Sequence, residues 1–129
     1  MHLGKGDKVL ESIQSEMDRL GVKNAVLLSA IGSLRKLVFH VITKTTDKSV
    51  NKFVTIEDAI EVGGMQGLII DGEPHLHIIC SDKANNTYVG HLENGCEVQY
   101  LMELSFMEID GLDLTRRNDE FGNAYIDKK

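Results

Sequence analysis

The sequence predicts an α+β domain, in which one N-terminal helix packs on an antiparallel or mixed sheet of about six strands. Two observations support this class. Only one stretch, near the N-terminus, has the apolar periodicity of an amphipathic helix, whereas the rest consists of short apolar or alternating segments separated by turn residues. With 129 residues, of which 42% are hydrophobic, the chain is expected to form a single domain over residues 1–129.

The helix is expected between Asp7 and Gly21. Asp7 can cap its N-terminus, and Gly21 can end it in the left-handed conformation that glycine adopts without strain. Between them, apolar residues follow the spacing i, i+3, i+7, i+10, at Leu10, Ile13, Met17 and Leu20. This spacing is typical of an amphipathic helix of about four turns.

Two buried strands are expected next, over residues 24–31 and 37–43, with a turn at 31–35 between them because Gly32 and Ser33 lie there. His40 lies in the second of these strands. We interpret it first as a core or interface histidine, with metal ligation as the minor alternative. Residues 52–62 combine β-branched residues with an acidic centre, so helix and strand both fit, and strand is favoured.

The remaining segments are also expected to form sheet. Three glycines between 63 and 67 are expected to make turns or a bulge, and Asp71-Gly72 a further turn. From Cys96 to Met107, apolar and mainly polar residues alternate as in a strand, but Leu101 and Met107 make the polar face partly apolar. That face is expected to meet a partner subunit. Residues 111–129 are polar and are expected to form a partly ordered C-terminal tail.

Three of the five histidines lie in or just after the segment 72–80. If this segment is a strand, His75 and His77 share one face, and the apolar residues Leu76, Ile78 and Cys80 share the other. The Asp- and Asn-containing run 81–87 predicts a hairpin turn, after which His91 returns.

The hairpin register decides whether His91 joins the other two histidines. A loop with an odd number of residues, such as Lys83–Asn85 closed by Asp82 and Asn86, sets His91 opposite His77. A loop of two or four residues sets it opposite Ile78 instead, unless Gly90 forms a bulge that restores the phase.

Three imidazoles on one face would suit a transition metal such as zinc, whose bonds to histidine nitrogen measure about 2.0–2.1 Å. With His75, His77 and His91 as the only protein ligands, one coordination position would stay open, as in catalytic zinc sites. The alternative is that these histidines are ordinary core or surface residues, because a single His-x-His pair is a weak signal.

Composition argues against several classes of protein. Twenty acidic residues against fourteen basic ones give a formal charge of −6, and tryptophan is absent, so a nucleic-acid-binding protein is not expected. No apolar run approaches the ~20 residues of a membrane span, and residues 1–7 lack the apolar region of a secretory signal. The two separated cysteines fit a reducing compartment, so a cytoplasmic protein is expected.

The elements Gly72-Glu73-Pro74-His75-Leu76-His77 and Gly90-His91-Leu92-Glu93-Asn94-Gly95 resemble those of the plants-and-prokaryotes conserved (PPC) domain family, of the single-domain prokaryotic type. The resemblance implies a strongly bent antiparallel sheet, a homotrimer and, in some members, zinc held by the residues matching His75, His77 and His91. Val89 stands where members often have a second glycine. The Arg-Gly-Arg-Pro AT-hook of plant relatives is absent, so their DNA binding is not implied.

The leading hypothesis is therefore a homotrimeric metal-binding protein with His75, His77 and His91 as ligands. One alternative is an interaction or regulatory module that recruits a protein partner without a metal. Another is a metal-dependent hydrolase, in which Glu93 or Glu73 would act as general base because each shares the face of a neighbouring histidine.

Overall fold

The computed structural model describes residues 1–129 and contains one helix and nine strands. Strands β1 to β7 form one antiparallel sheet with the order β1-β7-β2-β4-β5-β6, and β3 pairs with β2. The predicted α+β class is confirmed. In chain order the elements are β1 (His2–Gly4), α1 (Val9–Leu20), β2 (Ala25–Ile42), β3 (Asn51–Ile56), β4 (Ile60–Ile70), β5 (Glu73–Asp82), β6 (Thr87–Leu92), β7 (Glu97–Glu108), β8 (Leu114–Asn118) and β9 (Ala124–Lys128).

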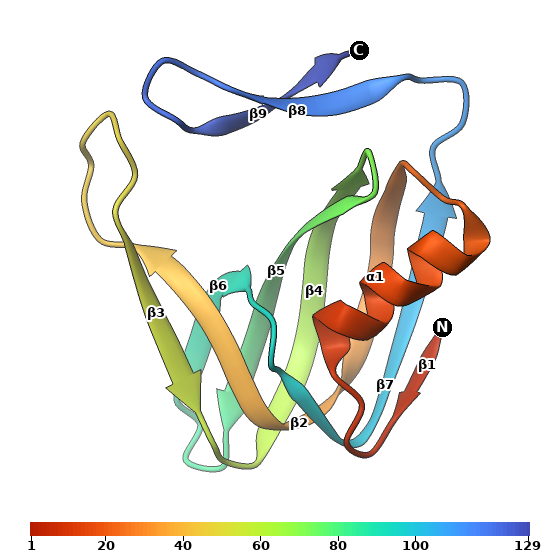
Figure 1. Cartoon of the computed structure of the whole chain (residues 1–129). Coiled ribbons are helices and arrows are strands. Elements are labelled where there is room, and N and C mark those ends of the chain that lie inside the picture. The colour runs from red at the N-terminus through yellow and green to blue at the C-terminus, as the bar shows by residue number, and fades with distance from the viewer.

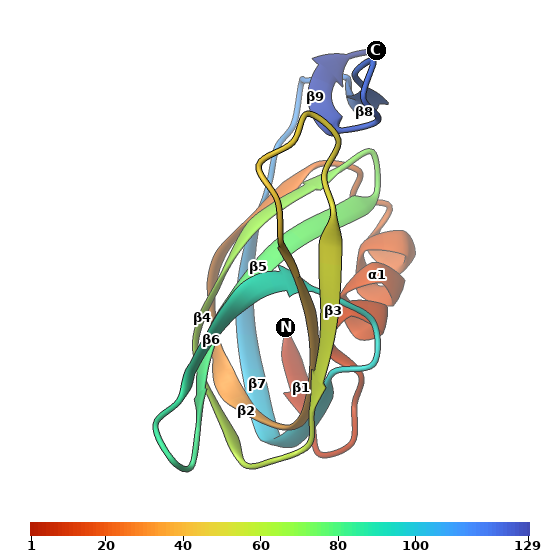
Figure 2. The ribbon, with the colours of Figure 1, turned by 90° about the vertical axis from the view of Figure 1, so that its left-hand side faces the viewer.

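Strand β2 organises the sheet because it pairs with four other strands. Its first half lies between β4 and β7, and its second half pairs with β3 and with the end of β6. The β6 contact, through Phe39↔Leu92 and His40↔His91, returns to β2 and closes the ring β2-β4-β5-β6. The sheet is therefore strongly curled, as Figures 1 and 2 show.

The turn predicted at residues 31–35 is wrong, because β2 runs through this segment as one strand. A side chain at Gly32 would collide with the carbonyl oxygen of Leu101 in β7. The glycine thus allows two backbones to approach closely, and the register with β7 shifts beside it. The glycines at 63–67 likewise lie inside β4, with a bulge between Val62 and Gly64.

Helix α1 covers the curled sheet but begins differently from the prediction. Its N-cap residue is Lys8, which makes no capping side-chain hydrogen bond, and the Asp7 carboxylate instead accepts the Gly4 N–H at 2.8 Å. Its C-terminus matches the prediction, since Gly21 is left-handed with φ 68°. The helix is 12 residues long, and no helix of the protein has the length and apolar character needed to span a bilayer.

The core lies between α1 and the inner face of the sheet. Ile13 and Met17 of the helix pack there against buried residues of β2, β4, β5 and β7. On β5, the inward residues are Leu76, Ile78 and Cys80, as the alternation predicted. His75 and His77 therefore lie on the outer face of this strand.

The polar segment after residue 110 forms a hairpin of β8 and β9, with Arg116 opposite Ile126. Several contacts attach this hairpin to the body. The Lys129 ammonium lies 2.7 Å from the Asp71 carboxylate, and the Asn123 amide donates to the Asp47 carbonyl at 2.8 Å. The hairpin accordingly crosses one end of the curled sheet (Figures 1 and 2), near the turn between β4 and β5.

Candidate metal centre

The hairpin of β5 and β6 has the odd-numbered loop. Asp82 and Asn86 close a loop of three residues, in which Asn85 has the left-handed φ of 63° that asparagine tolerates. The Asp82 carboxylate stabilises this loop by accepting hydrogen bonds from Ala84 and Asn86 backbone amides at 2.9 and 3.0 Å. His77 and His91 are consequently direct cross-strand partners.

Gly90 brings β6 against β2. A Cβ atom at this position would lie 2.5 Å from the Phe39 ring and 2.6 Å from the His40 carbonyl oxygen, so only glycine allows the crossing. At this contact His91 pairs with His40 of β2, on the side away from its β5 partner His77. Val89, which replaces a frequent family glycine, is exposed and pairs with β5, so this departure does not affect the crossing.

Four imidazole rings gather on the outer face of β5, β6 and β2. The Nε2 atoms of His75 and His77 are 3.3 Å apart. The ring centroid of His91 lies 4.7 Å from that of His75 and 5.6 Å from that of His77, and its ring stacks on His40 at 4.4 Å. The three histidines predicted from the sequence are thus neighbours in space.

Glu93, which follows β6, joins this cluster. Its carboxylate forms a short hydrogen bond with His40 Nδ1 and lies 3.4 Å from His91 Nδ1. One ligand atom from each of His40, His91 and Glu93 lies within 4.8 Å of the others, so these three residues could hold a metal ion, whereas the ring nitrogens of His75, His77 and His91 do not all come together as closely. Glu73, the other predicted acid, pairs with Ile70 at the start of β5, is exposed, and makes no hydrogen bond or ion pair with the cluster.

The electrostatics favour the neutral forms of His75 and His91. Burial, with the positive charges of His91 and Arg116 nearby, lowers the pKa of His75 to about 4. Burial and the neighbouring His40 also lower the pKa of His91. Since the neutral ring offers a nitrogen lone pair, both residues are in the form that ligates a metal at neutral pH.

Two cavities border the histidines. One, of about 470 Å³, lies between β4, β5 and the C-terminal hairpin and is lined by Gln66, Leu68, His75, His77, Arg116 and Ile126. The other, of about 430 Å³, lies beside β2, β5 and β6, and His40, His77 and His91 contribute to it. The cluster therefore borders a cavity on each of two sides.

Sequence reasoning did not place His40 or Arg116 at this site. His40 reaches it through the pairing of β2 with β6, and Arg116 through the position of the C-terminal hairpin. Both arrangements depend on contacts between distant segments. No local pattern in the sequence signals them.

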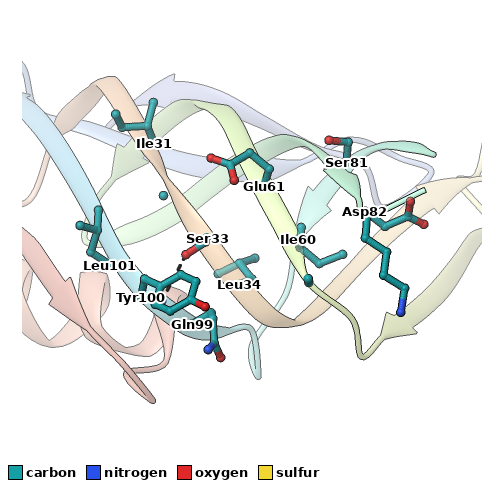
Figure 3. A pocket seen from close by; sticks show the side chains of 13 residues that line it. Ile31, Ser33, Leu34, Ile60, Glu61, Ser81, Asp82, Gln99, Tyr100 and Leu101 are labelled. Carbon is teal, nitrogen blue, oxygen red and sulfur yellow. Dashed lines mark hydrogen bonds between the residues drawn. The ribbon is translucent and has the colours of Figure 1, made fainter. Parts of the chain in front are cut away.

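A third cavity, of about 460 Å³, lies where β2, β4 and β7 meet and contains no histidine. Figure 3 shows the side chains of Ile31, Tyr100 and Leu101 along it, with Glu61 on the β4 side. Ile31 is 51% exposed and Tyr100 is 76% exposed. This hollow combines exposed apolar side chains with polar ones, among them Ser81, Asp82 and Lys83.

Comparison with known proteins places the chain in a family. The model of the Plants and Prokaryotes Conserved (PCC) domain matches residues 1–110. A curated relative, the bifunctional protein GlmU of a Synechococcus species, is 23% identical over 113 residues. The match covers 84% of this chain but only 17% of the length of that relative.

Solved structures share the fold. A PPC protein of Pyrococcus horikoshii superposes with a TM-score of 0.84 at 21% identity, over 100% of this chain and 90% of that one. A metal-containing protein of Archaeoglobus fulgidus gives 0.77 at 24% identity, over 95% and 86%. A Bacteroides thetaiotaomicron protein, whose description suggests DNA binding, gives 0.84 at 15% identity, over 98% and 89%.

Proposed function

The chain belongs to the Plants and Prokaryotes Conserved domain family, and from this premise we propose that it binds one divalent transition metal, zinc, through His75, His77 and His91. The observation that carries the proposal is the convergence of these three imidazoles on one sheet face, with two Nε2 atoms 3.3 Å apart. The metal-containing Archaeoglobus fulgidus protein of the same fold supports it.

The chemistry of the donors fits zinc. Zinc takes neutral imidazole nitrogen readily, and three such ligands leave a fourth position for a small molecule. Metal-ligating histidines usually donate their second ring N–H to a carboxylate or carbonyl, which fixes the tautomer. His91 Nδ1 is buried and makes no hydrogen bond, and the Glu93 carboxylate 3.4 Å away could accept its N–H after a small approach. We therefore assign Glu93 a positioning role rather than the general-base role.

A second ligand set shares His91 but uses His40 and Glu93 instead of His75 and His77. Glu93 already accepts a hydrogen bond from His40, which is the arrangement of a positioning pair. The two sets make opposite predictions about His40 and His77, so replacing each residue separately distinguishes them.

The test is elemental analysis of the protein purified without a metal-affinity tag, for wild type and the matched variants His77→Ala and His40→Ala. We expect about one zinc per chain in wild type, loss of most of it in His77→Ala, and retention in His40→Ala, because loss of a ligating imidazole removes much of the affinity. Circular dichroism would verify that both variants are folded. Full zinc occupancy in folded His77→Ala would reject the ligand assignment.

We also propose that the protein assembles as a homotrimer in the cytoplasm. Large apolar side chains are exposed on the outer face of β2 and β7, namely Leu28, Ile31, Leu101 and Met107. An exposed apolar face of this kind is typical of a subunit interface.

Cys80 and Cys96 are buried and unpaired, and burial raises the pKa of each thiol to about 11, so neither is a reactive thiolate.

A further inference from the structure

Arg116 is a charged side chain without a protein partner. It lies on β8, directly opposite Ile126 of β9, and both residues line the cavity that borders His75 and His77. The Nε atom of Arg116 is buried and makes no hydrogen bond, and no carboxylate forms an ion pair with this residue. The neighbouring Arg117, in contrast, lies 2.9 Å from the Asp127 carboxylate.

A buried guanidinium N–H without an acceptor is unfavourable, because it has lost water and gained nothing in exchange. Such groups are rare in native proteins and call for an explanation. The hairpin that carries Arg116 is fixed to the body, since Asp71 contacts both Lys129 (2.7 Å) and Thr115 (3.3 Å). Arg116 is therefore held at the cavity.

We propose that this cavity binds a small oxyanion, a carboxylate or phosphate group, whose oxygens accept hydrogen bonds from the Arg116 guanidinium opposite the imidazoles of His75 and His77. Guanidinium is suited to this task because its parallel N–H groups match the two oxygens of such a group. The cavity volume of about 470 Å³ is in the range of small-molecule sites.

The proposal deepens the metal-binding function and rests on it in one respect. A divalent ion held by the histidines would add positive charge to the same cavity, so the anion should bind more tightly to zinc-loaded protein than to metal-free protein. The guanidinium contact itself is independent of the metal. Arg116 also lies beyond residues 1–110, which match the family model.

Isothermal titration with inorganic phosphate and with acetate tests the proposal and separates the two anion classes. The proteins are zinc-loaded and metal-free wild type, Arg116→Gln, Arg116→Lys and, as matched control, Arg117→Gln. We expect at least one anion to bind wild type and Arg117→Gln alike. Its affinity should fall at least about tenfold in Arg116→Gln and less in Arg116→Lys, since lysine keeps the charge but not the fork of N–H groups.

The outcomes are distinct. Equal anion affinity of wild type and folded Arg116→Gln would overturn the proposal, and so would absence of binding by both anions to every form. Arg116-dependent binding to protein that takes up no zinc would support the anion site while rejecting the metal proposal. Thermal melts verify that the variants are folded. Retention of anion binding in Arg116→Lys would further support the anion site.

Discussion

Among single residues, Asp82 is important for the site because its buried carboxylate stabilises the loop that sets the β5–β6 register. It accepts hydrogen bonds from the Asn86 side chain (3.0 Å) and the Tyr88 hydroxyl (2.8 Å), besides those from two backbone amides. These donors, the Asn86 side chain foremost, lower the pKa of Asp82 to about 2. The ionised form is thus strongly preferred in the folded protein.

From this follows a pH dependence. The pKa of Asp82 is depressed from an unfolded value of about 3.9, so its stabilisation is complete above about pH 5 and is lost as pH falls toward 2. Asp82→Asn should lower the urea midpoint at pH 6, because its amide N–H groups would face other donors. The difference from wild type should shrink below pH 4. The exposed Glu57→Gln serves as control, and an Asp82→Asn midpoint equal to wild type at pH 6 would contradict this assignment.

At the scale of elements, the decisive contact is the antiparallel pairing of the end of β6 with β2, which places His91 between His77 and His40. Local sequence could predict the face shared by His75 and His77, because strand alternation is a local property. Local sequence does not decide between odd and even loops for His91, because hydrogen bonds between Asp82 and Asn86 set the register. His40 could not be placed, because the closing of β2 on β6 is a long-range event.

The same reasoning explains why the prediction of a turn at residues 31–35 is wrong. Gly32 is a turn signal when only neighbours in sequence are considered. In the fold, β7 approaches it so closely that any side chain would collide with the Leu101 carbonyl oxygen. The glycine therefore serves the contact between two strands, and β2 continues.

The close pairing of β6 with β2 predicts the effect of adding one methyl group at Gly90. Gly90→Ala would place Cβ 2.5 Å from the Phe39 ring, so β6 must move away from β2. We expect the free energy of unfolding to fall by about 1–3 kcal/mol, the usual cost of overpacking, together with weaker zinc binding. Gly64→Ala is the control, because nothing lies within 4 Å of its added Cβ. Chemical denaturation measures the free energy of unfolding of both variants. An equal decrease in Gly90→Ala and Gly64→Ala would refute the close approach of β6 to β2.

For the whole molecule, the exposed apolar face of β2 and β7 predicts self-association. Sedimentation velocity at micromolar concentration should show a trimer. Ile31→Glu should convert it to smaller species, because a charge would be buried in the interface. Leu20→Glu, at a helix position of similar exposure, 53% against 51%, should leave the trimer intact. A monomeric wild-type protein would exclude the assembly.

The net charge of the molecule predicts little affinity for nucleic acid. A formal charge of −6 opposes the counterion release that drives binding to duplex DNA. In fluorescence anisotropy with random and AT-rich duplexes, we expect no binding beyond weak, salt-sensitive association at about 150 mM salt. Sub-micromolar affinity under these conditions would instead support the DNA binding suggested for the Bacteroides thetaiotaomicron protein of similar fold.

The closing of β2 on β6 also determines when the histidine cluster can form during folding. His40 and Glu93, whose side chains meet at this closure, are 53 positions apart along the chain. Contacts between such distant residues form late, because the loop-closure entropy is lost before the contact stabilises the chain. A metal that needs this closure, such as one held by His40, His91 and Glu93, would not bind the transition state and would slow unfolding while leaving the refolding rate almost unchanged. Zinc held by His75, His77 and His91 needs only the β5–β6 hairpin, so it can bind before the closure and should also speed refolding.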